Sequence, residues 1–147
     1  MPEAGTVLAF DFGVKRIGVA VGETLLGRAR ALATIAAEDN DTRFGEIARL
    51  IGQWQPQILV LGLPLAEDGG EHELTARARR FAHQLEGRFR LPVILVDERY
   101  SSREADARLA ATGLPWQERK RELDAAAAQI ILQDYFDARV DDKARTA

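Results

Sequence analysis

The chain contains no cysteine and only two histidines among its 147 residues. Without cysteine the protein cannot form disulfides, bind zinc through thiolates or use a thiol nucleophile, and this composition suits a reducing compartment. Because histidine is also scarce, no cluster of histidine or cysteine ligands competes with oxygen ligands for a metal.

Long apolar runs are also missing. The first segment, MPEAGTVLAF, lacks the basic stretch and long apolar core of a secretion signal. The longest apolar run, ILVLGLPLA at 58–66, is too short to cross a bilayer. We therefore expect a cytoplasmic protein with no membrane partner.

Neither sign of charge is in large excess. The formal net charge of −3 argues against a surface of uniformly positive potential. Basic residues gather in three segments, with acids between them: 77–90, 99–108 and 119–121. Such runs are usually solvated faces, so charge alone gives weak support for a nucleic-acid partner.

The pattern of apolar residues predicts an α/β fold. A chain of this length can bury roughly 70 % of its unfolded surface in one core, and we expect one domain over 1–147 with a frayed tail over about 138–147. The expected strands are 7–13, 16–23, 29–35, 58–65 and 92–100, and the expected helices are 42–54, 74–85, 101–113 and about 123–135. This order predicts a mixed five-stranded sheet, an antiparallel three-stranded meander plus parallel strands, with helices on both faces.

Asp11 stands where the first strand ends, on the same face as Val7 and Ala9. A buried ionised carboxylate is costly unless it is paired or holds a metal. The alternative is a turn aspartate that accepts hydrogen bonds from backbone amides near Gly13. Lys15 and Arg16 follow in the turn, where they are either solvated or attract phosphate.

The pair Asp97-Glu98 ends another strand. Strand neighbours point to opposite faces, so only one of the two acids can share the face of Asp11. The remaining acid can pair with Arg99 or cap the next helix. It is also possible that both acids have only such a structural role.

Asp124 opens the last helix, immediately before four alanines. One interpretation is that Asp124 is a helix cap and has no further role. The small side chains would also let the helix lie close to the sheet, and a helix N-terminus favours an ionised carboxylate. Three acids without nitrogen or sulfur ligands are typical of Mg²⁺ or Mn²⁺ sites, where two such ions can assist phosphoryl chemistry.

Four segments together resemble the YqgF/RuvX family of the RNase H-like superfamily. They are DFGVKRIGVAVGE (11–23), VLGLPLAEDGGE (60–71), VDERYSSREA (96–105) and LDAAAAQIILQDYF (123–136). Members of this family are described as Holliday junction resolvases and as pre-16S rRNA nucleases. The segments occur in the family's order and span nearly the whole chain.

The resemblance implies an RNase H-like fold and assigns roles to six residues. Asp11, Glu98 and Asp124 would be the catalytic and metal-binding triad, holding Mg²⁺ or Mn²⁺. Lys15, Arg16 and Arg99 would contact the substrate.

The expected function is hydrolysis of phosphodiester bonds in structured RNA, in the maturation of pre-16S rRNA. The expected partners are pre-rRNA and ribosomal precursor particles, and the expected state is a monomer or weak homodimer. One alternative is a Holliday junction resolvase acting on branched DNA, which a stable dimer would favour because symmetric cutting needs two active sites. Another is an inactive nucleic-acid-binding or ribosome-assembly module. ATP phosphotransfer has little support, because actin-like kinases place ATP between two domains of this kind.

Overall fold

The computed structural model describes residues 5–64, 72–97 and 116–146, and three isolated positions, 107, 111 and 113. Within the last segment, side chains are described for residues 123–139. The predicted helix at 101–113 therefore lies almost wholly outside the described residues. The elements are β1 (Thr6–Phe12), β2 (Ile17–Glu23), β3 (Arg28–Ile35), α1 (Asn40–Trp54), β4 (Ile58–Leu63), α2 (Glu73–Phe89), β5 (Val93–Asp97) and α4 (Trp116–Thr146).

The strands form one sheet in the order β3-β2-β1-β4-β5. The first three strands are an antiparallel meander, while β4 runs parallel to β1 and β5 runs parallel to β4. This arrangement confirms the predicted mixed sheet. Because β1, β4 and β5 run in one direction, their carboxyl ends lie along the same edge of the sheet.

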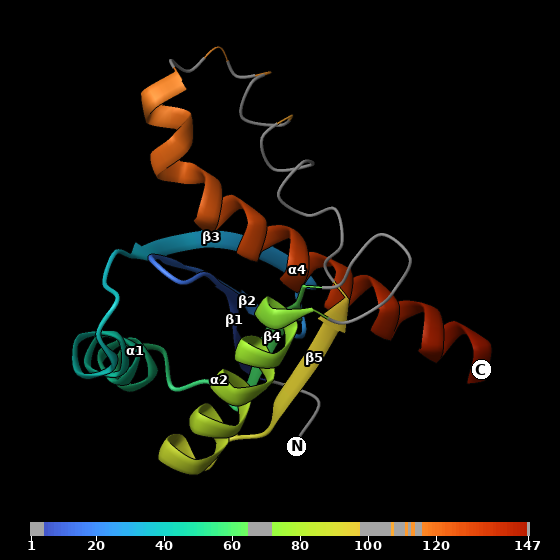
Figure 1. Cartoon of the computed structure of the whole chain (residues 1–147). Coiled ribbons are helices and arrows are strands. Elements are labelled where there is room, and N and C mark those ends of the chain that lie inside the picture. The colour runs from blue at the N-terminus through green and yellow to red at the C-terminus, as the bar shows by residue number, and fades with distance from the viewer. Residues whose placement is uncertain are drawn as a thin grey trace.

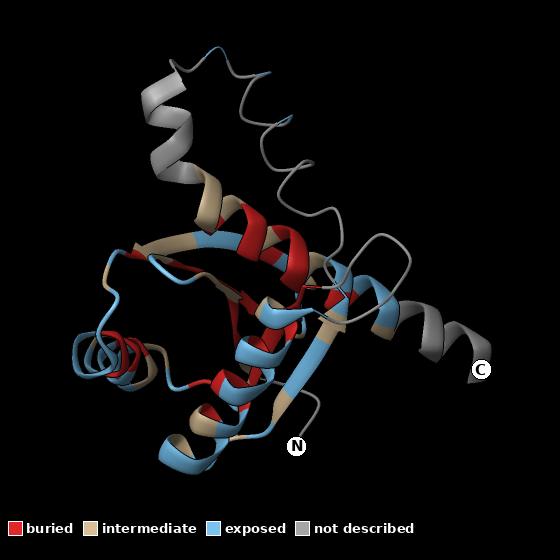
Figure 2. Ribbon diagram, in the orientation of Figure 1, coloured by how far each residue is buried: buried red, intermediate tan, exposed pale blue. Residues whose placement is uncertain are grey.

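The sheet separates two layers of helix (Figure 1), with α4 on one face and α1 and α2 on the other. Alternate residues of β1 divide between the two cores. Leu8 and Phe10 pack toward α1 and α2, whereas Val7 and Ala9 pack toward α4. Both faces of the sheet are therefore covered, which explains why the central strands are apolar on both sides. Figure 2 shows the buried positions concentrated in the sheet and along the middle of α4.

All three described helices are longer than predicted: α1 begins at Asn40 rather than at residue 42, and α2 ends at Phe89 rather than at residue 85. The helix α4 begins at Trp116 rather than near Leu123, and it continues to Thr146. The prediction followed only the apolar stripe, whereas the flanking residues are polar but good helix formers. The helix α1 is capped by Asp39, which accepts a hydrogen bond of 2.9 Å from the Thr42 amide, and hydrogen bonding from Thr42 holds the pKa of Asp39 below its usual value.

In the described part of the chain, no helix combines the length and hydropathy that a bilayer span requires.

The helix α4 approaches β2 very closely at Gly18. A Cβ atom at this position would lie 1.8 Å from the carbonyl oxygen of Asp124 and 2.9 Å from the amide nitrogen of Ala125. These are backbone atoms, which cannot rotate away as a flexible side chain can. Ala128 is fully buried in the core between α4 and the sheet, so a small side chain of the alanine run faces the strands next to this contact. The predicted close approach of this helix to the sheet is confirmed.

We predict that Gly18→Ala lowers the free energy of unfolding by about 3 kcal/mol or more, because the added methyl group would overlap the backbone of α4. Gly45 is the matched control. It lies exposed in α1 with open space around it, and Gly45→Ala should raise stability by up to about 1 kcal/mol through helix propensity. Urea unfolding followed by circular dichroism measures both values. Equal effects of the two substitutions would contradict the close approach.

Candidate active site at the carboxyl end of β1

Asp11 and Asp124 lie at the same corner of the molecule. In the antiparallel pairing of β1 and β2, Asp11 stands directly opposite Gly18. Residues opposite one another in such a pair project from the same face. The backbone of Asp124 packs against that face at Gly18, so the structure brings this part of α4 to the strand end that carries Asp11. Asp124 lies more than two turns inside α4, because the helix begins at Trp116, and the prediction that Asp124 opens the helix is wrong.

The side chain of Asp124 forms an ion pair with Arg16. The Nε atom of Arg16 donates to Oδ2 of Asp124 at 2.7 Å, with the two side chains 42 % and 20 % exposed. This contact joins the β1–β2 turn to α4 across 108 positions of sequence. An ion pair of this exposure contributes about 0–1 kcal/mol, so it orients the carboxylate without fixing it permanently.

Asp97 lies on the other face of the sheet. It stands opposite Leu63 in the parallel pairing of β4 and β5, and Leu63 belongs to the core beneath α1 and α2. Its neighbour Val96 packs against the α4 core instead. Asp97 is exposed and does not share the face of Asp11.

Glu98 and Arg99, which were predicted for the site, lie outside the described residues. Among the residues that are described, no group of three or more acids and histidines is close enough together to hold an ion. Two of the three predicted metal ligands, Asp11 and Asp124, are thus placed at one corner by the fold.

The β1–β2 turn holds both predicted basic residues that the structure describes. Lys15 is exposed and Arg16 is half-buried. A Cβ atom on Gly13 would lie 2.5 Å from the carbonyl oxygen of Arg16, so the tight turn requires glycine there. The turn therefore presents two cations beside Asp11, at the edge of the sheet where parallel strands end.

Arg43 supports this turn from the opposite face and was missed by the sequence analysis. It is 5 % exposed. Its Nη2 atom donates to the carbonyl oxygens of Gly13, at 2.7 Å, and Val14, and its Nε atom donates to the carbonyl oxygen of Ala37. The guanidinium also lies 5.6 Å from the centre of the Phe12 ring. Burial lowers the pKa of Arg43 from its ordinary value, although an arginine remains protonated.

A signal for Arg43 was present in the sequence. It precedes Ile47 and Leu50 at helical spacing, and all three are on the buried side of α1. A cation in line with an apolar stripe predicts burial, and a buried cation needs acceptors. The sequence could not indicate that these acceptors are carbonyl oxygens of a turn about 30 residues away.

The chain matches a family model described as "RuvX: Holliday junction resolvase" over residues 5–138. It is 59 % identical over 133 residues to a protein of Methylobacillus flagellatus named "Putative pre-16S rRNA nuclease", covering 90 % of this chain and 91 % of that one. A protein of Bordetella petrii with the same name is 55 % identical over 138 residues, covering 94 % and 98 %.

Two solved structures share the fold at low sequence identity. The Fowlpox virus resolvase in complex with Holliday junction DNA superimposes with a TM-score of 0.59 at 11 % identity, covering 90 % of this chain and 97 % of that one. RuvC of T. thermophilus in complex with a Holliday junction substrate gives 0.52 at 19 % identity, covering 92 % and 96 %. The predicted RNase H-like fold is confirmed by these neighbours.

We predict that Arg43→Ala lowers the free energy of unfolding by about 2–3 kcal/mol, because charged hydrogen bonds to the turn are lost. Arg49→Ala is the control, since Arg49 is an exposed residue of the same helix paired only with Glu46 in the described structure, and it should change stability by less than about 0.5 kcal/mol. Urea unfolding measures stability, and hydrogen exchange should show faster exchange confined to the β1–β2 hairpin. Unchanged exchange there in Arg43→Ala would refute the supporting role.

Proposed function

The chain belongs to the RuvX family, and from this premise we propose that it is a nuclease that uses Mg²⁺ or Mn²⁺ to hydrolyse phosphodiester bonds in structured RNA. The proposed substrate is pre-16S rRNA, for which the curated relatives are named. The observation that carries the proposal is that the backbone of Asp124 contacts Gly18, the partner of Asp11 in the sheet, beside a turn with two cations. Sequence identity of 55–59 % to the named relatives supports the enzyme class. The position of Asp11 and Asp124 at one corner supports placing the active site there.

Asp11, Glu98 and Asp124 would hold the metal. Carboxylate oxygens are hard ligands that suit Mg²⁺ and Mn²⁺, and the two described acids share one face of the sheet, so the donor set fits. When bound, the ions supply activation of water and stabilisation of the leaving oxygen.

Glu98 is assigned in preference to Asp97 because of strand alternation. Asp97 faces the α1 and α2 layer, so continued alternation predicts that the next residue faces the α4 layer, as Asp11 does. Arg99 would then stand beside the triad as a third cation for the substrate.

Arg16 has two partners available in this proposal. In the described structure it neutralises Asp124, and a guanidinium can also bind a phosphate through two nitrogens. Substrate and metal arriving together would let Arg16 exchange the carboxylate for a phosphate oxygen. Lys15, exposed next to it, would attract the same backbone as a point charge.

Branched DNA is the second candidate substrate. It is favoured by the description of the family model, which names a Holliday junction resolvase. Symmetric cutting of a four-way junction would require a stable dimer, whereas pre-rRNA processing in the cytoplasm, on ribosomal precursor particles, would allow a monomer or weak homodimer. Sedimentation analysis and parallel assays on both substrates would separate the two.

We predict that Asp11→Asn lowers the rate of pre-16S rRNA cleavage with Mn²⁺ by at least about 100-fold, because even groups that only support a metal ligand cost 10–100-fold. Asp41→Asn provides the control, since Asp41 is exposed in the first turn of α1 and should retain full activity. Single-turnover cleavage of labelled RNA is the measurement. Equal rates for Asp11→Asn and the unaltered protein would exclude the proposed site.

Mn²⁺ titration separates an active site from an inactive assembly module. Isothermal calorimetry should detect binding that is lost in Asp124→Ala and retained in Asp41→Asn. A chain that binds RNA but binds no Mn²⁺ in the millimolar range would be such a module rather than an enzyme.

The strand-end assignment predicts opposite outcomes for neighbouring substitutions. Glu98→Gln should lower cleavage by at least about 100-fold as a ligand substitution, while Asp97→Asn should retain activity within about threefold, because Asp97 is exposed on the other face. Both proteins are compared in the same single-turnover assay. Loss of activity only in Asp97→Asn would move the third ligand to position 97.

A further inference from the structure

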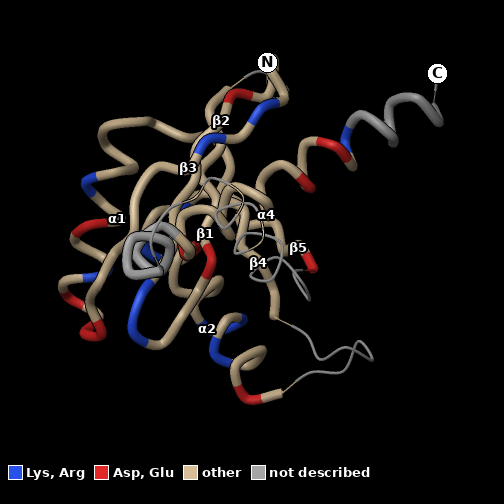
Figure 3. Tube along the Cα trace, turned by 90° about the horizontal axis from the view of Figure 1, so that it is seen from above, with Lys and Arg blue, Asp and Glu red and all other residues tan. Residues whose placement is uncertain are grey.

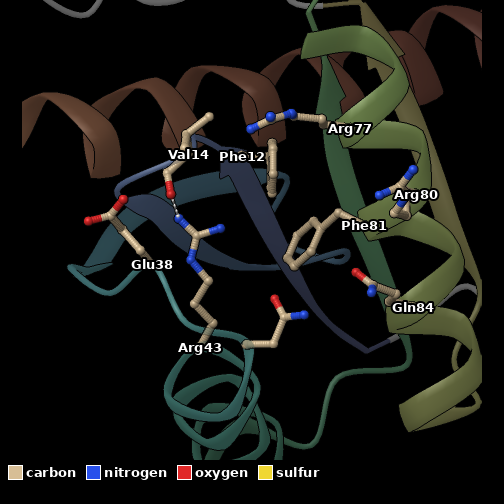
Figure 4. Close-up of a pocket in the computed structure, with 9 residues that line it drawn as sticks. Phe12, Val14, Glu38, Arg43, Arg77, Arg80, Phe81 and Gln84 are labelled. Carbon is tan, nitrogen blue, oxygen red and sulfur yellow. Dashed lines mark hydrogen bonds between the residues drawn. The ribbon is translucent and has the colours of Figure 1, made fainter. Parts of the chain in front are cut away.

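A pocket of about 280 Å³ lies between α1, α2 and the β1–β2 turn. We call it the arginine pocket, because Arg43, Arg77 and Arg80 line it together with Glu38, Phe12 and Phe81. Figure 4 shows Arg77 extending from α2 toward Phe12, Arg80 lying along α2, and Arg43 and Glu38 on the opposite side of the two phenylalanine rings. Phe12 packs against the core beneath α1 and α2, so the pocket lies on the other face of the sheet from Asp11.

The charges that line the arginine pocket are mainly positive. Three guanidinium groups face a single carboxylate, that of Glu38. Figure 3 shows further basic positions along α2, together with an acidic position at the start of the helix. Arg77 also pairs with Glu73 at 3.4 Å, but these side chains are 49 % and 83 % exposed, so this pair competes only weakly with another anion.

Arg43 gives the pocket a fixed, buried cation. Its Nε and Nη2 atoms donate to backbone carbonyl oxygens, and Figure 4 shows the remaining terminal nitrogen turned toward Phe12 and the pocket interior. Because the group is 5 % exposed and held by the backbone, it would contribute to anion binding without first losing side-chain freedom. The tilted rings of Phe12 and Phe81, 5.0 Å apart, form an apolar floor.

We propose that the arginine pocket binds a backbone phosphate of the nucleic-acid substrate at a point away from the cut. Guanidinium groups match phosphate oxygens through paired hydrogen bonds. A volume at the lower limit of ligand sites suits a small anionic group rather than a whole cofactor. This inference rests on the proposed nuclease function, because it is the substrate that would supply the phosphate.

The β1–β2 hairpin connects the pocket to the candidate active site. Val14 and Phe12 line the pocket, while Asp11 and Arg16, their neighbours in the chain, lie at the corner with Asp124. A nucleic-acid strand that crosses the turn at exposed Lys15 would therefore place one phosphate on each side of the hairpin. The pocket would fix the register of the substrate relative to the metal site.

The test compares two charge-matched double variants of the full chain. Arg77→Gln with Arg80→Gln removes the two pocket arginines of α2, and Arg49→Gln with Arg79→Gln removes two exposed arginines of α1 and α2 that do not line the pocket. Affinity for fluorescein-labelled pre-16S rRNA fragments is measured by fluorescence anisotropy in EDTA between about 50 and 200 mM salt. Circular dichroism spectra equal to that of the unaltered chain show that both variants are folded.

We expect the pocket variant to bind about 10-fold more weakly and to lose about one unit from the slope of log affinity against log salt, as expected for one phosphate contact. The control variant should stay within about twofold of the unaltered chain. Nuclear magnetic resonance should show the Arg77 and Arg80 side-chain signals shifting with RNA, and far less with inorganic phosphate at the same phosphate concentration.

The possible failures are distinguishable. Normal RNA binding and cleavage, with the pocket variant equal to the control, would overturn the pocket assignment and leave the nuclease proposal intact. Pocket signals that respond to inorganic phosphate but not to RNA would also overturn it, in favour of a small-anion site. An unaltered chain that binds no RNA and no four-way DNA junction would overturn both.

Discussion

The contact between the Asp124 carbonyl oxygen and Gly18 is the constraint on which the candidate site depends. No side chain fits between α4 and β2 at this point, so the backbone of the helix lies directly on the strand. Gly18 faces Asp11 across the hairpin, and the contact therefore brings an acid from the first strand to an acid more than 100 residues later. A larger residue at position 18 would separate the two carboxylates even if each kept its own local conformation.

The hairpin that carries Asp11 is held from both faces of the sheet. On the α4 face, Arg16 is paired with Asp124. On the other face, Arg43 donates hydrogen bonds to two carbonyl oxygens of the turn. Two arginines thus position the same few residues, one through an exchangeable surface pair and one through buried hydrogen bonds. The difference in burial separates their roles, because the buried group gives the turn its shape and the exposed group remains able to change partner.

Much of this arrangement follows from local patterns in the sequence. Alternation in β1 predicts the face of Asp11, and the alanines after Asp124 predict a close helix, because both depend on neighbouring residues alone. The contacts of Arg43 could not be predicted, since its acceptors are backbone oxygens brought near by tertiary structure. The length of α4 was underestimated because an apolar stripe marks where a helix is buried rather than where it ends. Alternation predicts that Asp97 and Glu98 face opposite sides of the sheet, but only the pairing of Asp97 with Leu63 shows which side Asp97 faces.

The ion pair between Arg16 and Asp124 has to be compatible with metal binding if the corner is catalytic. A single Nε contact of 2.7 Å between partly exposed groups is weak, at about 0–1 kcal/mol. A divalent ion between carboxylates attracts each of them with twice the charge of a guanidinium, and a neighbouring phosphate gives the displaced arginine a new anionic partner. The pair is therefore suited to an exchange in which Asp124 stays neutralised throughout. Without substrate, the guanidinium of Arg16 neutralises the Asp124 carboxylate.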